Sequence, residues 1–270
     1  MKALIRKSQR GFTLLELLVV MAVLSIMMAG IFSSVNSGMK RYHAEESRIN
    51  TVQDGRNFLE QMVRDLHSAG YPNSRLYMQG AVIPAGGLAA GITAVSSTAM
   101  QFEGDVDNTG VVQQITYTLA PNAGATCPGT ISRTMVQKGS GAVPAPTAEL
   151  QDVINSVGGA GAYPIAGTTV FGGGQAPVAN DVIYAGYKAT SVFTYYDSNG
   201  AVINVPPDLN GGNLVLGQNI AAGGTPRVLS ISLNMLSPNI DMQTKMRPAA
   251  SMGASVRLNN VACPACTPPI

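Results

Sequence analysis

A single carboxylate, Glu16, lies within residues 12–35, a run of 24 residues that holds no other charge. At the centre of a lipid bilayer a carboxylate costs about 2.5–3.5 kcal/mol on insertion scales, so acids in such runs have a partner in most proteins. Cleavage between Gly11 and Phe12 would create an α-amine four residues before Glu16. That amine can neutralise a carboxylate, most usefully the one on a neighbouring subunit. The simpler alternative is that Glu16 lies at the membrane surface and is hydrated.

A second group of oxygen ligands lies on one predicted turn, where Glu103, Asp105, Asp107 and Asn108 precede a glycine. A hard cation such as calcium needs six to eight oxygen ligands, and alternating acidic residues before a glycine resemble the opening of a calcium loop. The distal glutamate of a complete EF-hand loop is missing, because Val-Val-Gln-Gln follows the glycine. We favour a hairpin turn whose Asp and Asn side chains bond their own backbone. Calcium is kept as the alternative, and no other cofactor is expected.

The chain has three cysteines, Cys127, Cys263 and Cys266. Disulfides persist outside the cytoplasm. The Cys-Pro-Ala-Cys spacing of the last two is that of a redox pair, but it lies in a proline-ended tail without a thioredoxin-like βαβ context. A structural disulfide is favoured; all three pairings stay open, and the thiol left over is free for an intermolecular bond. Zinc would need a fourth ligand, and both histidines, His43 and His67, are remote in the sequence.

Composition excludes several classes of protein. Charged residues make up 12% of the chain and hydrophobic residues 46%, which rules out a disordered, highly charged chain. Two histidines are too few for a metal centre or relay built on several of them, and the P-loop, G-x-S-x-G and H-E-x-x-H patterns are absent. We therefore expect no enzyme. Strong nucleic-acid binding is not expected either, because phosphate binding needs clustered Lys and Arg and the chain after residue 11 is close to neutral.

The elements that position Glu16 begin with a basic leader, residues 1–11, which holds Lys2, Arg6, Lys7 and Arg10. The apolar run of residues 12–35 is long enough to cross a hydrocarbon layer of about 30 Å as a helix. Basic residues before a span hold its start on the cytoplasmic side, so the rest of the chain is exported. Residues 36–41 do not resemble an A-x-A signal cleavage site, so we expect the mature protein to keep the apolar run.

The span continues into a second, amphipathic half. Residues 40–69 contain no proline, and their apolar residues recur at steps of three, four or seven, which marks one buried helix stripe: Tyr42, Ile49, Val52, Leu59, Met62, Val63 and Leu66. Gly70-Tyr71-Pro72 supplies a stop. We therefore predict one helix over residues 12–69, with its first half in lipid and its second half packed on the exported head.

Residues 70–270 form the expected head, in which 17 of 201 residues are charged. Eight short runs have the composition of strands: 99–103, 111–119, 130–137, 182–187, 192–196, 201–205, 227–235 and 254–258. Asp197-Ser198-Asn199-Gly200 predicts a hairpin turn between two of them. The Gly/Ala/Pro-rich stretches at 80–91, 139–147, 158–179 and 206–226 predict loops. The sequence thus predicts an α+β fold, a long helix packed on a β-rich head.

Gly11-Phe12-Thr13-Leu14-Leu15-Glu16, preceded by a short basic leader and followed by an apolar run, resembles the type IV pilin signature. The resemblance implies that a prepilin peptidase cuts after Gly11 and N-methylates Phe12, and that Glu16 assists assembly by meeting the amine of an adjacent subunit. It further implies a single-pass inner-membrane protein with a periplasmic head. An inner-membrane assembly platform would then add it to a pilus fibre at the cell surface.

Residues 59–72, and later 115–119, 131–133 and 192–197, resemble the PilW family of minor pilins and the related J-type pseudopilins of type II secretion. This resemblance implies a minor pilin that helps to start a type IV pilus and caps its tip, in contact with other major and minor pilins through the N-terminal helix. Three alternatives stand beside it: a type II secretion pseudopilin, an exported adhesin or binding module on a pilin-type anchor, and a plain anchored protein that stays uncut.

Overall fold

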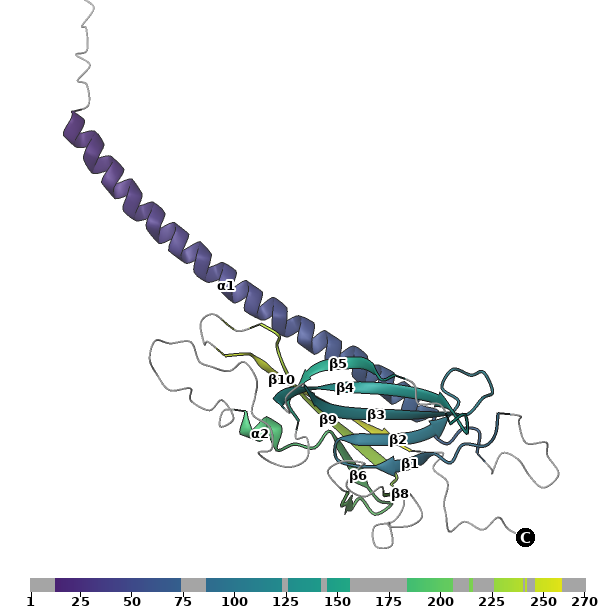
Figure 1. Cartoon of the computed structure of the whole chain (residues 1–270). Helices are drawn as coiled ribbons and strands as arrows, with labels where there is room; N and C mark the ends of the chain where they lie inside the picture. Colours follow the sequence, from purple (N-terminus) through teal and green to yellow (C-terminus); the bar gives the residue numbers. More distant parts are fainter. Residues whose placement is uncertain are drawn as a thin grey trace, which may run out of the picture.

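The computed structural model describes residues 13–73, 86–122, 126–141, 145–155, 184–205, 214–215, 226–239, 241 and 246–258. These residues form one long N-terminal helix and a β-rich head, the pilin-like α+β arrangement that the sequence predicts (Figure 1). The helix leaves the head as a gently curved rod, so its first half lies clear of the sheet (Figure 1).

Helix α1 (Leu14–His67) runs without interruption for 54 residues, a length of about 80 Å. Thr13 is its N-cap, and the Thr13 hydroxyl accepts a hydrogen bond from the backbone N–H of Glu16 at 3.3 Å. This contact satisfies one of the free N–H groups of the first turn. Beyond the other end, Gly70 has a φ of 78°, a left-handed conformation that glycine adopts without a steric penalty. The predicted helix is confirmed, with each end two residues inside the expected 12–69.

The head contains one antiparallel sheet of ten strands. In chain order the elements are β1 (Ile92–Val95), β2 (Ala99–Gly104), β3 (Gln113–Asn122), β4 (Thr126–Gln137), β5 (Thr147–Val153), the short helix α2 (Ala185–Lys188), β6 (Phe193–Tyr196), β7 (Val202–Ile203), β8 (Leu214–Val215), β9 (Val228–Leu236) and β10 (Ala249–Arg257). Their order in the sheet is β7-β6-β9-β5-β4-β3-β2-β1-β8, and β10 pairs with β9 outside this path. Strand β9 thus has β10 on one edge and, successively, β6 and β5 on the other.

The second half of α1 shares one hydrophobic core with this sheet. Phe58 packs edge-on against Tyr117 with ring centroids 5.9 Å apart, and Tyr117 stacks on Phe102 with centroids 6.4 Å apart. Such aromatic pairs add about 0.5–1.5 kcal/mol each beyond the area that they bury. From the predicted stripe, Leu59 and Met62 are buried in the same core, together with Leu66. The helix is therefore fixed to the head by its last turns.

The prediction that the first residues of the helix stripe are buried is wrong. Tyr42 and Ile49 are exposed, because the helix first reaches the head at Ser47 and a different face turns inward. That face carries small residues at steps of four, Ser47, Thr51 and Gly55, all of which are buried. At Gly55 a β-carbon would meet the Met235 side chain and lie 2.6 Å from the Met252 sulfur. Small side chains therefore let α1 approach β9 and β10 closely.

One predicted strand and one predicted loop need correction, and two strands were not expected. Residues 184–187 lie in a bend and helix α2 rather than in the predicted strand 182–187. Strands β1 and β5 were not expected, and β8 falls inside the predicted loop 206–226. The hairpin turn between β6 and β7 is confirmed: the Asp197 carboxylate accepts backbone N–H groups from Asn199 and Ala201, both at 2.8 Å.

Candidate functional site

The first half of α1 is an apolar rod that contacts no other described element. Every residue from Leu14 to Met39 is exposed, although most of them are large and hydrophobic. Within the described residues, α1 is the single helix long and apolar enough, by length and composition, to cross a membrane. Ser25 fits this environment, because its hydroxyl donates to the Met21 carbonyl at 2.8 Å and so keeps a partner within the helix.

Glu16 stands in the first turn of this rod, three residues after the N-cap Thr13. A Thr followed three residues later by a Glu is the capping-box arrangement, and a negative charge in the first turn also favours the helix dipole. Glu16 is exposed, as a group that meets a partner from outside the chain must be. The predicted processing residues Gly11 and Phe12 lie outside the described residues, so their roles remain predictions.

Two polar contacts fix the second half of α1 to the head, and the first is at its end. The Asp65 carboxylate accepts the Tyr117 hydroxyl at 2.6 Å and the Nε of Arg133 at 2.9 Å. Side chains of Asp65 and Arg133 are 13% and 16% exposed, so this is a nearly buried ion pair. Burial is the largest single influence on the pKa of Arg133 and lowers it, but the charges and hydrogen bonds of Asp65 and Tyr117 together outweigh burial, so the pKa is raised. Sequence reasoning missed this cluster, since Tyr117 and Arg133 lie 52 and 68 residues after Asp65.

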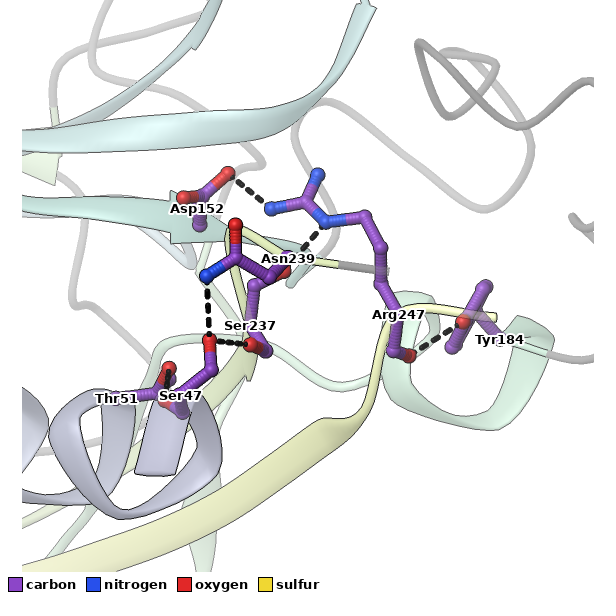
Figure 2. Close-up of polar contacts among 7 residues, drawn as sticks. All are labelled: Ser47, Thr51, Asp152, Tyr184, Ser237, Asn239 and Arg247. Carbon is purple, nitrogen blue, oxygen red and sulfur yellow. Dashed lines mark hydrogen bonds and ion pairs between the residues drawn. The ribbon is translucent and has the colours of Figure 1, made fainter. Parts of the chain in front are cut away.

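The second contact lies where α1 first meets the head (Figure 2). The hydroxyls of Ser47 and Ser237 share a short hydrogen bond, and the Asn239 amide donates to Ser47 Oγ at 3.3 Å. Arg247 stabilises the segment that follows β9. It donates to the Ser237 carbonyl at 2.5 Å and to the Asp152 carboxylate at 2.6 Å. The sequence carried no signal for this network, because serine and asparagine at these positions read as ordinary surface residues.

Alkaline pH should weaken the fold, because two buried tyrosines hold their protons tightly. Burial raises the pKa of Tyr117 and Tyr195 well above the ordinary value of 10.0, and the charge of Asp65 adds to the effect at Tyr117. A raised folded-state pKa gives stability below the unfolded-state pKa and loses it as the pH rises above that value. We expect constant stability from about pH 7 to 9 and then a fall above about pH 10, by up to about 1.4 kcal/mol per pH unit for each tyrosine.

Thermal unfolding of the full chain in detergent, followed across this pH range, measures the effect. The variant Tyr195→Phe should remove one tyrosine's share of the slope, since the Tyr195 hydroxyl makes only a long, 3.5 Å bond to the Ala99 carbonyl. An alkaline slope that is the same in Tyr195→Phe and in the parent chain would contradict the assignment.

The acidic turn between β2 and β3 is closed by its own hydrogen bonds. Asp105 accepts the backbone N–H groups of Thr109 at 3.0 Å and Gly110 at 2.9 Å. Asp107 accepts the Thr109 hydroxyl at 2.7 Å and the Gln113 amide at 2.6 Å, contacts that lower its pKa against the opposing effect of burial. Asn108 adopts a positive φ of 54°, which asparagine tolerates better than most residues. Aspartate side chains that bond the backbone of their own turn are what the hairpin-turn interpretation predicts.

Glu103, the remaining candidate calcium ligand, contacts residues outside the acidic turn. Its carboxylate accepts the Ala90 N–H at 2.9 Å and pairs with the Lys138 ammonium at 2.7 Å. No group of three or more His, Cys, Asp or Glu side chains within the described ranges is arranged to hold a metal ion.

Calcium therefore stays a hypothesis with a direct test. Titrating calcium into the full chain in detergent should give no heat of binding, because the Asp105 and Asp107 oxygens already accept backbone and side-chain donors. The control is Asp105→Asn, which should behave like the parent chain in this titration. Saturable heat at one ion per chain, lost in Asp105→Asn, would establish a calcium loop instead.

The disulfide candidates cannot be placed. Cys263 and Cys266 lie outside the described residues, and of Cys127 only the backbone, in β4, is described. A structural disulfide therefore stays a prediction, with all three pairings of these cysteines open.

Residues 6–32 match a family described as the prokaryotic N-terminal methylation motif. The match includes Gly11, Phe12 and Glu16 and continues into the exposed half of α1. The comparisons with curated proteins and with solved structures gave no match. The chain thus carries the signal of type IV pilins and pseudopilins on an apolar, membrane-type helix, which supports a structural role and not an enzymatic one.

Proposed function

We propose that this chain is a minor pilin, a low-copy structural subunit that takes part in initiation and tip assembly of a type IV pilus. The observation that carries the proposal is the methylation motif at residues 6–32, continuous with a helix whose apolar half is exposed and whose other half is locked to a β-rich head. A subunit of this shape stores its apolar half in the membrane and then buries it among the helices of a fibre.

The mechanism follows from this division of α1. A prepilin peptidase removes residues 1–11 and methylates the amine of Phe12, while the head stays in the periplasm. The inner-membrane assembly platform then adds the subunit to other major and minor pilins, and Glu16 meets the methylated amine of a neighbour. Lipid contacts of the apolar half are exchanged for contacts with other helices, so the transfer does not expose apolar surface to water.

The minor-pilin assignment is finer than the motif itself, and it rests on the PilW-like runs in the sequence. The second candidate, a J-type pseudopilin of type II secretion, has the same motif and would use the same chemistry in a shorter fibre. Neighbouring genes separate the two: retraction motor and pilus secretin genes favour the pilus, and secretion genes favour the pseudopilus. An adhesin on a pilin-type anchor would instead bind a surface through its head.

The proposal is tested by the mass of the mature N-terminal peptide, from protein made together with a prepilin peptidase. We expect N-methyl-Phe12 as the first residue. Gly11→Asp should stay uncut, because a charged side chain replaces the small residue before the scissile bond, while Lys7→Arg, which keeps the leader's charge, should be processed normally. An intact Met1 start in the parent chain would refute the proposal and leave a membrane-anchored β-rich domain.

A further inference from the structure

Strand β10 gives the sheet a long edge that no described residue pairs. It pairs with β9 over nine residues, from Ala249 to Arg257, without a register shift. The edge strands at the two ends of the main path, β7 and β8, have two residues each. Natural sheets blunt long edges with charged residues, proline or a bulge; residues 249–256 contain none of these, and Arg257 at the end of the strand is the one charged residue of β10. This edge is therefore suited to accept another strand.

The register shows which backbone groups are free. The Ser237 N–H donates to the Pro248 carbonyl and the Leu258 N–H to the Arg227 carbonyl, both at 2.8 Å, at the two ends of the β9–β10 ladder. Hydrogen-bonded and non-bonded pairs alternate along an antiparallel ladder, so the even-numbered residues of β10 bond to β9. The odd-numbered residues direct N–H and C=O outward: Ala249, Ser251, Gly253, Ser255 and Arg257. All of these except Ala249 are exposed.

A groove of about 680 Å³ follows the same edge. One wall is β10, residues 251–254, and the other is the flank of α1. The floor and wall from α1 are apolar at Val52, Leu59 and Val63, and the rim carries Arg56, Glu60 and Arg64. An extended segment lying here would bond to the β10 backbone and place alternate side chains against the apolar residues, which is how strand addition obtains affinity and specificity.

The charges on the rim indicate the chemistry of the occupant. Arg56, Glu60 and Arg64 follow each other at steps of four, and no ion pair joins them to each other or to any other residue that the structure describes. The rim therefore has an excess of positive charge. A strand carrying carboxylates on its rim-facing side complements it.

A second copy of this chain does not fit the edge. Two β10 strands pairing antiparallel in one continuous sheet would be related by a two-fold axis perpendicular to the sheet. Because α1 extends away to one side of the head, that axis would send the two apolar halves in opposite directions (Figure 1). Both halves must enter the same membrane if the proposed function holds.

We infer that the β10 edge and the groove beside α1 receive an extended, carboxylate-bearing strand from a different subunit of the fibre. The inference rests on the proposed function for the existence of such a subunit. It adds a specific contact in the head to the contacts of the N-terminal helix, and it explains why the edge carries no charged residue, proline or bulge before Arg257.

Amide hydrogen exchange at single-residue resolution tests the inference, comparing the processed chain alone in detergent with the same chain in fibres sheared from cells. Exchange at Ser251, Gly253 and Ser255 should slow by roughly a hundredfold on assembly, while Met252 and Ala254 should be slow in both samples. This alternation distinguishes strand pairing from simple coverage. Fast exchange at the odd-numbered amides in fibres overturns the inference. Slow exchange at the same amides in the isolated chain also overturns it, since the chain itself or a second copy would then occupy the edge.

The variant Ser255→Pro removes one outward N–H and no ladder bond, a position at which an edge strand accepts proline. It should keep N-methyl-Phe12, but its content in fibres should fall about tenfold and the assembly-dependent protection at Ser251 and Gly253 should disappear. The matched control Ser255→Ala keeps the N–H and should behave like the parent chain. Normal fibre content and protection in Ser255→Pro overturn the inference alone, whereas a parent chain without N-methyl-Phe12 overturns the proposed function.

Discussion

Replacing Asp65 by alanine should lower the free energy of unfolding by about 3–5 kcal/mol, the cost of removing one partner from a buried ion pair. The substitution leaves the Arg133 guanidinium, 16% exposed, without its counter-charge, and it removes the acceptor of the Tyr117 hydroxyl, which lies in the core. A domain of this size loses about 2–4 °C in Tm per kcal/mol, so we expect a fall of roughly 10 °C. Thermal unfolding of the full chain in detergent measures it.

Two further variants separate the ion pair from general damage to the helix. Asp54→Ala removes an exposed carboxylate from the same helix and should cost less than about 0.5 kcal/mol. The pair Asp65→Leu with Arg133→Met removes both charges together, so it should recover the part of the loss that comes from the unpaired Arg133, because replacing a whole buried pair by apolar residues is often neutral; the Tyr117 hydroxyl still lacks its acceptor. A loss below about 1 kcal/mol in Asp65→Ala would contradict the role given to the cluster.

The cluster lies at one end of the docked half of α1. Asp65 lies 18 residues after Ser47, about 27 Å along α1, so the two polar contacts hold the docked half of the helix at both ends. Between them, the hydrophobic core and the close approach at Gly55 fix the helix against β9 and β10. A variant that releases these contacts should leave the head attached to α1 by the polypeptide chain alone, so the orientation of the head relative to the helix would no longer be fixed.

The elements that were predictable are those whose signal is local. Helix α1 follows from a proline-free apolar run and a helical period, and β3 and β9 follow from strict alternation. Strand β5 was missed because Thr147–Val153 contains Glu149 and Asp152 and lacks that alternation. The predicted strand 182–187 contains aromatic and β-branched residues typical of strands, yet its described residues lie in a bend at Tyr184, which belongs to the small cluster of Ile154, Tyr184 and Leu236, and in helix α2. Tertiary packing decided both cases.

The candidate site divides in the same way. Glu16 could be singled out from the sequence because one acid in an apolar run is a local anomaly, and it lies within the residues that match the methylation motif; its role in assembly stays a prediction. The free edge of β10 was not, since it depends on which strands pair, and the sequence does not state strand order. Asp65 stood inside a run that resembles the PilW family, but its partner Arg133 is 68 residues away and nothing in one sequence links the two.

Glu16→Gln should be cleaved and methylated like the parent chain and yet be recovered in fibres at roughly one hundredth of its level. An unpaired carboxylate in lipid costs about 2.5–3.5 kcal/mol, and pairing with a neighbour's amine on assembly removes that cost. Glutamine has no charge to neutralise, so this driving force is lost and the neighbour's amine is left without a partner. Since each 1.4 kcal/mol is a factor of ten, the expected reduction is about a hundredfold. The measurement is the ratio of chain in sheared fibres to chain in membranes, with Glu45→Gln, an exposed acid of the same helix, as the matched control.

The choice of glutamine decides between the two roles that the structure allows for Glu16. As the third residue after the N-cap Thr13, Glu16 is placed to support the start of α1, and glutamine serves equally well in a capping box. Loss of the dipole interaction is worth about 0.3–1 kcal/mol, which is at most a factor of about five. A capping role therefore predicts at most about a fivefold loss of fibre content for Glu16→Gln. An assembly role predicts about a hundredfold loss, which is roughly twenty times larger. Normal content in Glu16→Gln would assign Glu16 to the helix start and leave the amine of Phe12 without its proposed partner.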